Sequence, residues 1–341
     1  MGGNALKQVN TRRYFADEYH LLEKEVINKF KERFPHRRVE AIKAYRQKES
    51  FGDMDLLFEA DNFTENVINV LNELFQPKQI ERNSSVYSFE YKDFQIDLIF
   101  TTKANFDASA NYFAWNDLGN LMGRVAHKLG FKYGHDGLSF VFRDGTYQYA
   151  EVNLSKDSKQ ILEFLDYDYS RFAQGFDSLK DIFEFTTSSM FFNKEIYAFD
   201  NRNHASRIRD RKRKTYNEFL QWVETVEHVN AYPWADMREK FGREYKQEFV
   251  DRAFQFFPEF KDQFTKIQAD FEMWKALKEK FNGDLVSQWT GLTGKDLGNF
   301  MIFVKDKRFN MKKEDWENLV LNGDVEKQVQ MWFNDEYMKA E

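Results

Sequence analysis

The segment FGDMDLLF, residues 51–58, places two aspartates, Asp53 and Asp55, at the start of a run of apolar residues. The run predicts a buried strand over residues 53–59. Side chains two residues apart leave the same face of a strand, so both carboxylates point the same way. Like charges at this spacing repel each other and cost stability unless something neutralises them. A lone pair of this kind is typical of a solvated strand edge, so its meaning depends on the rest of the chain.

A third aspartate follows in FQIDLIF, residues 94–100, where Asp97 lies between two apolar residues. With SVYSFEY and a Lys-Asp turn before it, this segment predicts a hairpin over residues 85–101. If the second hairpin strand neighbours 53–59, Asp53, Asp55 and Asp97 converge on one spot. Such a density of negative charge favours hard divalent cations. Two Mg²⁺ ions, with Mn²⁺ as a substitute, are the expected cofactors, because they activate an attacking hydroxyl and stabilise a leaving pyrophosphate.

The composition indicates a globular protein with a large core, since 42% of the 341 residues are hydrophobic and 37 are Phe. The chain has no Cys, which excludes disulfides, thiolate nucleophiles and cysteine-ligated zinc. No apolar run reaches the roughly 20 residues that cross a membrane, and the first residues lack the apolar stretch of a secretory signal. We therefore expect an intracellular, cytoplasmic monomer that is not secreted and has no membrane partner.

Helical periodicity predicts helices over residues 17–33, 64–75 and 116–129. The second is expected to be capped by Thr64 or Asn62. Beyond residue 185 the pattern changes to long amphipathic helices. These are expected over roughly 207–229, 234–256, 259–281, 294–306 and 312–338, the last with a break. The predicted fold class is α/β (α+β) with a mixed β-sheet, followed by a mostly α-helical C-terminal domain.

Two further segments follow the acidic motifs: NYFAWNDLGNLMGRVAHKLGFKY, residues 111–133, and VNLSKDSKQILEFLDYDY, residues 152–169. Taken in order with GDMDLLF and FQIDLIF, they resemble family X DNA polymerases, the DNA polymerase beta class of nucleotidyltransferases. The first segment is similar to the turn and helix that bind the dNTP, and the second to the end of that polymerase subdomain. The similarity extends over about residues 40–172. An acidic pair alone is a weak signal, but the ordered set is specific.

The resemblance implies a role for each matching residue. Asp53, Asp55 and Asp97 match the catalytic and metal-binding triad, with Asp97 nearest the primer hydroxyl. Tyr112 and Phe113 match a turn that crowds the nucleotide sugar and discourages a 2′-hydroxyl. The expected reaction is therefore transfer of a deoxynucleotide.

Further residues are expected to bind the nucleotide. Asn120 and Arg124 match helix positions that touch the incoming base and the templating strand, and their i, i+4 spacing places them on one helical face. Arg46 matches a triphosphate-binding arginine. Gly52 and Lys43 are further candidates for binding the nucleotide. The family has a Gly-Ser pair where this chain has Ile-Lys at 42–43, so Lys43 would supply charge without the close backbone approach that Gly permits. The turn at 114–115, Ala-Trp, is a second departure from the family.

The change of pattern near residue 185 and the resemblance together predict a division of the chain into four parts. These are an N-terminal arm and helix (1–40), a nucleotidyltransferase palm (41–110), a nucleotide-binding subdomain (111–185) and a helical domain that binds nucleic acid (186–341). The N-terminal lyase-type helical domain of the family is missing, because the palm-like part begins near residue 40. Deoxyribose-phosphate lyase activity is therefore not implied.

A basic run, RNHASRIRDRKRK at 202–214, stands out on a chain whose net charge is −6. Such a run commonly contacts phosphates without reading sequence. The candidate nucleic-acid residues are Arg207, Arg209, Arg211, Lys212, Arg213 and Lys214. The alternative interpretation is a solvated helix face or a contact with another partner.

A glycine pattern in GDLVSQWTGLTGKDLGN, residues 283–299, loosely resembles a segment in the helical regions of tRNA nucleotidyltransferases and bacterial poly(A) polymerases. The alternative interpretation is a glycine-capped turn between two helices. The pattern is short, and other signature motifs of those enzymes are not apparent.

The function expected from these motifs is Mg²⁺-dependent transfer of nucleotides from a nucleoside triphosphate to a nucleic-acid 3′ end. The Tyr112-Phe113 turn favours a DNA polymerase, so DNA is the expected partner rather than RNA. The glycine pattern favours an alternative, an RNA-end enzyme that adds A or CCA. The missing Gly-Ser pair supports another, a catalytically silent nucleic-acid-binding scaffold. Transfer to a protein or small-molecule acceptor also stays open.

Overall fold

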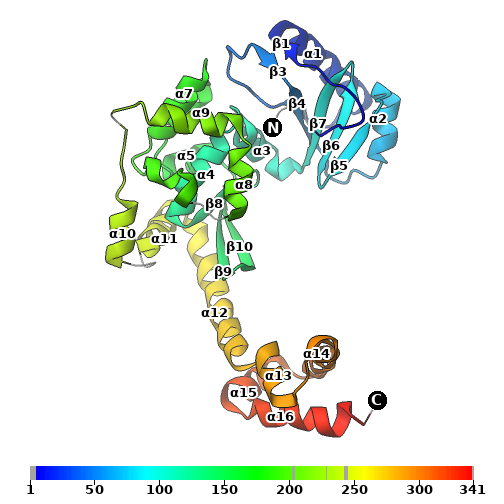
Figure 1. Cartoon of the computed structure of the whole chain (residues 1–341), viewed down its shortest axis with the longest axis vertical. Coiled ribbons are helices and arrows are strands. Elements are labelled where there is room, and N and C mark those ends of the chain that lie inside the picture. Colours follow the sequence, from blue (N-terminus) through cyan, green and yellow to red (C-terminus); the bar gives the residue numbers. More distant parts are fainter. Residues whose placement is uncertain (1–4, 202–203, 228, 242–244, 340–341) are drawn as a thin grey trace. The chain divides into compact units, whose positions relative to one another are not determined.

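The computed structural model of the chain describes residues 5–201, 204–227, 229–241 and 245–339. The chain divides into two compact units, one of residues 1–141 and 151–261 and one of residues 142–150 and 262–341 (Figure 1). The class is mixed α/β with a mixed sheet, and the C-terminal region is helical, as the sequence predicted. The four functional parts expected from the sequence do not coincide with these two compact units. Helix α7 (Leu179–Thr187) spans their boundary near residue 185 and lies within the first unit.

The first unit contains a five-stranded sheet with the strand order β2-β4-β7-β6-β5. The central strands β4 (Asp53–Glu59) and β7 (Phe94–Thr101) are parallel, and the other neighbours are antiparallel. Strands β6 (Val86–Tyr91) and β7 form the predicted hairpin. Its two turn residues, Lys92 and Asp93, have φ of 54° and 57°, as a two-residue hairpin turn of this hand requires. The outer strands are β2 (Val39–Ala41) and β5 (Ile80–Asn83).

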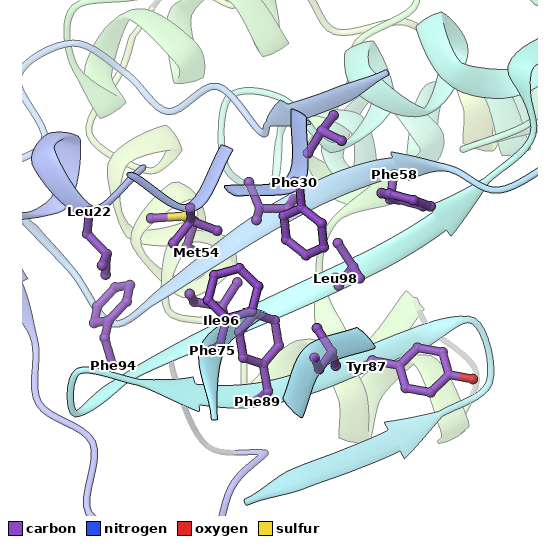
Figure 2. Close-up of a cluster of buried hydrophobic side chains, with 14 of the residues drawn as sticks. Leu22, Phe30, Met54, Phe58, Phe75, Tyr87, Phe89, Phe94, Ile96 and Leu98 are labelled. Carbon is purple, nitrogen blue, oxygen red and sulfur yellow. The ribbon is translucent and has the colours of Figure 1, made fainter. Parts of the chain in front are cut away.

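One face of this sheet is apolar and carries the core of the first unit. In the strand register Met54 is opposite Ile96, and Ile96 is opposite Phe89. Figure 2 shows these side chains packed together on one side of the strands. Helices α1 (Ala16–Arg33) and α2 (Val67–Phe75) supply further members of the same buried cluster. These two helices therefore shield this face of the sheet from water.

The other face of the central strand pair is acidic. Side chains alternate along a strand, so Asp53, Asp55 and Asp97 leave the face opposite to Met54 and Ile96. A one-residue shift of either strand would turn the aspartates into the core. Burial of the apolar face thus fixes the register that brings the carboxylates together.

The first unit continues from the sheet into helices α3 (Phe106–Phe113) and α4 (Leu118–Leu129). Its other elements are β1 (Tyr14–Phe15), β3 (Ser50–Phe51), η1 (Lys103–Asn105), β8 (Phe131–Gly134), α5 (Ser158–Phe164), α6 (Tyr169–Gln174), η2 (Lys194–Ile196), η3 (Phe199–Asn201), α8 (His204–Arg211), α9 (Lys214–Val223), α10 (Trp234–Phe241) and α11 (Tyr245–Phe256). Three elements contribute residues to both units, namely β9 (Gly137–Asp144), β10 (Tyr147–Ser155) and α12 (Pro258–Lys280). Strands β8, β9 and β10 form a second, three-stranded sheet.

The second unit is a small helical cluster. Its elements are α13 (Gly283–Thr290), α14 (Gly294–Phe309), α15 (Lys313–Asn322), α16 (Val325–Met331) and a π-helical turn at Trp332–Tyr337. Its core is formed by Val286, Phe300, Val304 and Trp316, with Phe281 packed edge-on against Trp316. This unit has a core of its own, so its helices are held by local packing.

Most helix predictions hold, and two are wrong. The second helix is capped by Asn66, whose side chain accepts a hydrogen bond from the Asn69 amide, and not by Thr64 or Asn62. The helix expected over 207–229 is two helices, because the Asn217 side chain donates to the carbonyls of Asp210, Arg211 and Arg213 and so ends α8. The helix expected over 234–256 contains residues 242–244, which lie outside the described residues. Of the helices that are described, none is both long and apolar enough to cross a membrane.

The contact between α3 and α4 predicts a strict need for glycine at position 119. A Cβ atom there would lie 2.1 Å from the carbonyl oxygen of Tyr112. Gly119→Ala should therefore destabilise the protein by about 1–3 kcal/mol, as overpacking does. Gly123 is the matched control on the same helix, since its Cβ would meet no atom closer than 3.8 Å. Gly123→Ala should be neutral or add up to about 1 kcal/mol in urea denaturation, and equal stability of the two variants would contradict this account.

Candidate active site

The three predicted carboxylates lie together on the acidic face of the central strand pair. Asp55 on β4 is the register partner of Asp97 on β7. Asp53 is two residues before Asp55 and leaves the same face. Neighbouring strands lie about 4.8 Å apart. The convergence that the sequence predicted is therefore present in the fold.

The clustering changes the proton affinity of two of these groups. Burial raises the pKa of Asp55 to about 7, and the charges of Asp53 and Asp97 add to the shift. Burial also raises the pKa of Asp97, with the charge of Asp53 acting in the same direction. Hydrogen bonds to Asp97 from Ser88 and Gln95 oppose the rise in its pKa. A cation at this face would favour the ionised form of each group.

Asp97 is held in place by neighbours on its own sheet. The Gln95 side-chain amide donates to both carboxylate oxygens of Asp97, at 2.9 and 3.1 Å. Gln95 is itself buried, and Ser88 lies opposite Asp97 on β6. These contacts fix the orientation of the carboxylate without supplying a positive charge.

The donor set fits a hard divalent cation. Mg²⁺ takes one or two protein carboxylates and completes its shell with water and substrate phosphates. Asp53, Asp55 and Asp97 offer oxygen donors from two adjacent strands. Among the described residues no group of three or more His, Asp or Glu side chains lies so that the group by itself could hold a metal ion. The carboxylates would therefore hold an ion only together with other oxygen ligands.

Lys48 is a residue that sequence reasoning missed. Burial lowers the pKa of the Lys48 ammonium. The charges of Asp53 and Asp55 act on the same group and partly oppose this shift, so Lys48 lies within electrostatic range of both carboxylates. The side chain lies over the ring of Phe51, 4.3 Å from the centroid, and Phe51 stacks on Tyr19. The only signal in the sequence was a lysine five residues before the acidic pair.

Arg46, expected to bind a triphosphate, makes contacts within the protein. Its guanidinium pairs with Asp177 and donates to the carbonyl of Gln174 at 2.9 Å. Its backbone amide donates to the carbonyl of Phe176. Arg46 and Asp177 are both exposed, so this ion pair is weak and open to exchange with another anion.

Lys43 and Gly52 lie on either side of the same loop. The Lys43 carbonyl accepts a hydrogen bond of 2.7 Å from the Trp115 amide, and its side chain is exposed. Gly52 is half-buried directly before Asp53. Trp115 and Asn116 have φ of 61° and 60°, a conformation that is rare for Trp. Packing of the buried Trp115 ring against Phe176 holds this turn.

Tyr112 and Phe113 end helix α3 and are half-buried. The Tyr112 ring packs edge-on against Tyr133, with centroids 5.2 Å apart, and Phe113 stacks on His135. Burial raises the pKa of Tyr112, and the nearby arginines Arg213, Arg209 and Arg124 oppose that rise. The tyrosine therefore lies between the aromatic core and a cationic region.

Asn120 and Arg124 lie on one face of α4, as their spacing predicted. Arg124 Nη2 lies 3.5 Å from Asn120 Oδ1 and 3.3 Å from the carboxylate of Asp210. The Asn120 side-chain nitrogen is buried and makes no hydrogen bond to any described residue. The pair is thus partly fixed by α8, and the Asn120 amide nitrogen is a buried donor.

The basic run has two kinds of residue. Arg209 and Arg213 pair with Asp210, and Arg213 also pairs with Asp117. Arg207 is half-buried and the other cations of the run are exposed. These are Arg211, Lys212 and Lys214. Residues 202 and 203, at the start of the run, lie outside the described residues.

The glycine pattern at 283–299 forms a turn between α13 and α14. Gly291 caps α13 in the left-handed conformation, with φ of 76°, and Gly294 has φ of 55°. This confirms the interpretation as a glycine-capped turn. The resemblance of this pattern to a segment of tRNA nucleotidyltransferases and poly(A) polymerases stays a prediction.

Two comparisons with known proteins were negative. No protein-family model matches the chain. No curated protein matches it at a significant level. The assignment of a function therefore rests on the residues and their geometry.

The raised pKa of Asp55 predicts a pH dependence of stability in metal-free protein. Between the ordinary Asp pKa near 4 and about 7, the unfolded chain is ionised while the folded Asp55 keeps its proton, so stability falls as pH rises through this window. Asp55→Asn removes this cost. In chelator, the variant should be roughly 1–3 kcal/mol more stable than wild type at pH 8 and nearly equal at pH 4.5.

Urea denaturation at both pH values measures this difference. Glu32→Gln is the control, because Glu32 is an exposed carboxylate on α1. A difference between Asp55→Asn and wild type that is the same at pH 4.5 and pH 8 would contradict the assigned pKa.

Proposed function

We propose that this chain is a Mg²⁺-dependent nucleotidyltransferase that adds nucleotides from a nucleoside triphosphate to a nucleic-acid 3′ end, as a DNA polymerase similar to family X. One observation carries the proposal. Asp55 and Asp97 are register partners on parallel strands, with Asp53 on the same face. Burial, together with the charges of Asp53 and Asp97, raises the pKa of Asp55, so the ionised carboxylates are unfavourable here without a counter-charge. Bound divalent cations would supply that counter-charge, and they would also attract the anionic triphosphate of an incoming nucleotide.

The residues of the chain divide the work. Asp53 and Asp55 would hold the cations together with Asp97, and the bound ions would supply charge stabilisation for the phosphoryl group in transfer. Asp97 is suited to accept the proton of the attacking hydroxyl, because its pKa is raised and Gln95 fixes its orientation. Lys48 supplies a positive charge beside Asp53 and Asp55. Family X enzymes have a phosphate-binding Gly-Ser pair at the position of residues 42–43, which this chain lacks. Arg46 would reach a triphosphate by exchanging its exposed pairing with Asp177.

The first test is primer extension. The protein is given Mg²⁺ and each dNTP and NTP separately, on single-stranded, templated and gapped DNA and on tRNA. We expect extension of DNA with dNTPs. Extension of tRNA with ATP or CTP would support the RNA-end enzyme in its place, and nucleic-acid binding without any transfer would support the silent scaffold.

The carboxylates should be individually necessary for transfer. Asp53→Asn, Asp55→Asn and Asp97→Asn should each lower kcat by at least about a thousandfold, since each removes an oxygen donor from the site. Each variant should stay folded, because the substitution relieves repulsion in metal-free protein. Single-turnover extension and circular dichroism measure the two effects. Near-wild-type transfer by all three folded variants would contradict the triad.

Lys48 should matter to the triphosphate and not to the primer. Lys48→Gln should lower kcat/KM for the nucleotide by about tenfold, because it removes the cation beside Asp53 and Asp55. The KM for primer should not change. Lys24→Gln is the control, since Lys24 is an exposed lysine on α1. An equal effect of both substitutions would show that Lys48 has no special role.

A further inference from the structure

A buried carboxylate outside the triad organises the basic run. The Asp210 side chain on α8 is 0% exposed. Its two oxygens lie 3.3 Å from Arg124 Nη2, 3.1 Å from Arg209 Nε and 3.9 Å from Arg213 Nε. An isolated carboxylate would be costly to bury. Three guanidinium groups offset that cost here, so removing Asp210 would leave them without their common anchor.

A second ion pair joins the same elements. Arg213, between α8 and α9, pairs with Asp117 at the start of α4. Arg124 is seven residues further along α4, so the α8–α9 segment is attached to this helix at two points. Figure 1 shows α8 beside α4. The relative position of these helices is therefore set by buried and half-buried charges.

Other cations of the segment take no part in this cluster. Arg211 and Lys212 are exposed, and the Lys214 side chain is 88% exposed. The Lys214 ammonium forms a long ion pair of 3.5 Å with Glu218 on the next helical turn. The outward side of the segment is thus cationic on a protein whose net charge is −6.

The cluster is also close to Tyr112 and Asn120, which the sequence resemblance predicts to lie beside the nucleotide. Tyr112 is within electrostatic range of Arg213, Arg209 and Arg124. Asn120 contacts Arg124 and keeps a buried amide nitrogen with no acceptor among the described residues. A bound ligand with acceptor oxygens or ring nitrogens would satisfy that donor.

We propose that Asp210 is a positioning residue that builds a phosphate-binding surface from α4, α8 and α9, and that its partner is the sugar-phosphate backbone of a nucleic-acid strand. The choice of nucleic acid as the partner rests on the proposed function. Asp210 holds Arg124, Arg209 and Arg213 in place, and this in turn presents Arg211, Lys212 and Lys214 outward as a set. The surface binds any sequence, because it offers charge to phosphates and no base-reading groups.

This arrangement makes a prediction that opposes simple electrostatics. Asp210→Asn makes the surface more positive, yet it should weaken nucleic-acid binding by about tenfold, because the arginines lose their anchor. Glu218→Gln makes the same change of charge outside the cluster and releases Lys214. It should tighten binding by roughly two- to threefold. Both variants remove one negative charge, but only Asp210→Asn removes the buried partner of the three arginines.

Fluorescence anisotropy with a labelled single strand and a labelled duplex, across a salt series, measures these effects. The titrations contain EDTA and no nucleoside triphosphate, so they do not depend on catalysis. Circular dichroism and thermal unfolding show whether Asp210→Asn is folded. If it is not, Asp117→Asn replaces it, since this change removes only the other anchor of Arg213 and should weaken binding severalfold.

The outward cations are tested separately with Arg211→Ala/Lys212→Ala. Both residues are exposed, so the fold should be retained. The slope of log K against log salt should become shallower by about 1.4–1.8, as expected for two lost phosphate contacts. An unchanged slope, or tighter binding by folded Asp210→Asn or Asp117→Asn, would overturn the proposal. If these binding results hold while primer extension fails, the surface stands and the transferase proposal falls.

Discussion

The packing of the apolar face of the parallel strands β4 and β7 is the interaction on which the structure of the first unit depends. Packing of Met54 and Ile96 against α1 and α2 fixes the strand register. The same register then forces Asp53, Asp55 and Asp97 onto the opposite face. The packing energy of the apolar face thus offsets the cost of the charge cluster on the opposite face of the sheet. Such a conflict between local cost and overall fold is what a functional site produces.

Three cations of the first unit that the sequence or the structure places in the candidate site differ in their burial. Lys48 lies beside the carboxylates, and its pKa is lowered by burial. Arg46 lies in the same loop, held by an exposed pairing with Asp177. Arg124 is held by the buried Asp210. The strength of each ion pair follows its burial. The exposed pair of Arg46 and Asp177 exchanges readily, whereas the buried pair of Arg124 and Asp210 acts as a structural anchor.

The α3–α4 connection links these parts through backbone contacts. Gly119 lets α4 approach the carbonyl of Tyr112, and the Trp115 amide bonds the carbonyl of Lys43. Gly175 permits a further close approach, since a Cβ there would lie 2.7 Å from the Trp115 ring. Tight backbone contacts therefore join the α3–α4 segment, which carries the residues predicted to bind the nucleotide, to the loop before Asp53. Larger side chains would not fit at Gly119 and Gly175.

The sequence by itself determined the elements whose signals are local. The apolar run of β4, the β6–β7 hairpin, the buried face of α1 and the pairing of Asp53 with Asp55 on one face all follow from periodicity over a few residues. Only the tertiary structure decided which strands are neighbours, where Lys48 and Arg46 point, and that the basic run is divided by a buried Asp210. The physical reason is that charges meet across large separations in sequence: Arg124 and Asp210 are 86 residues apart, and burial, which sets the strength of such a pair, is a property of the folded chain alone.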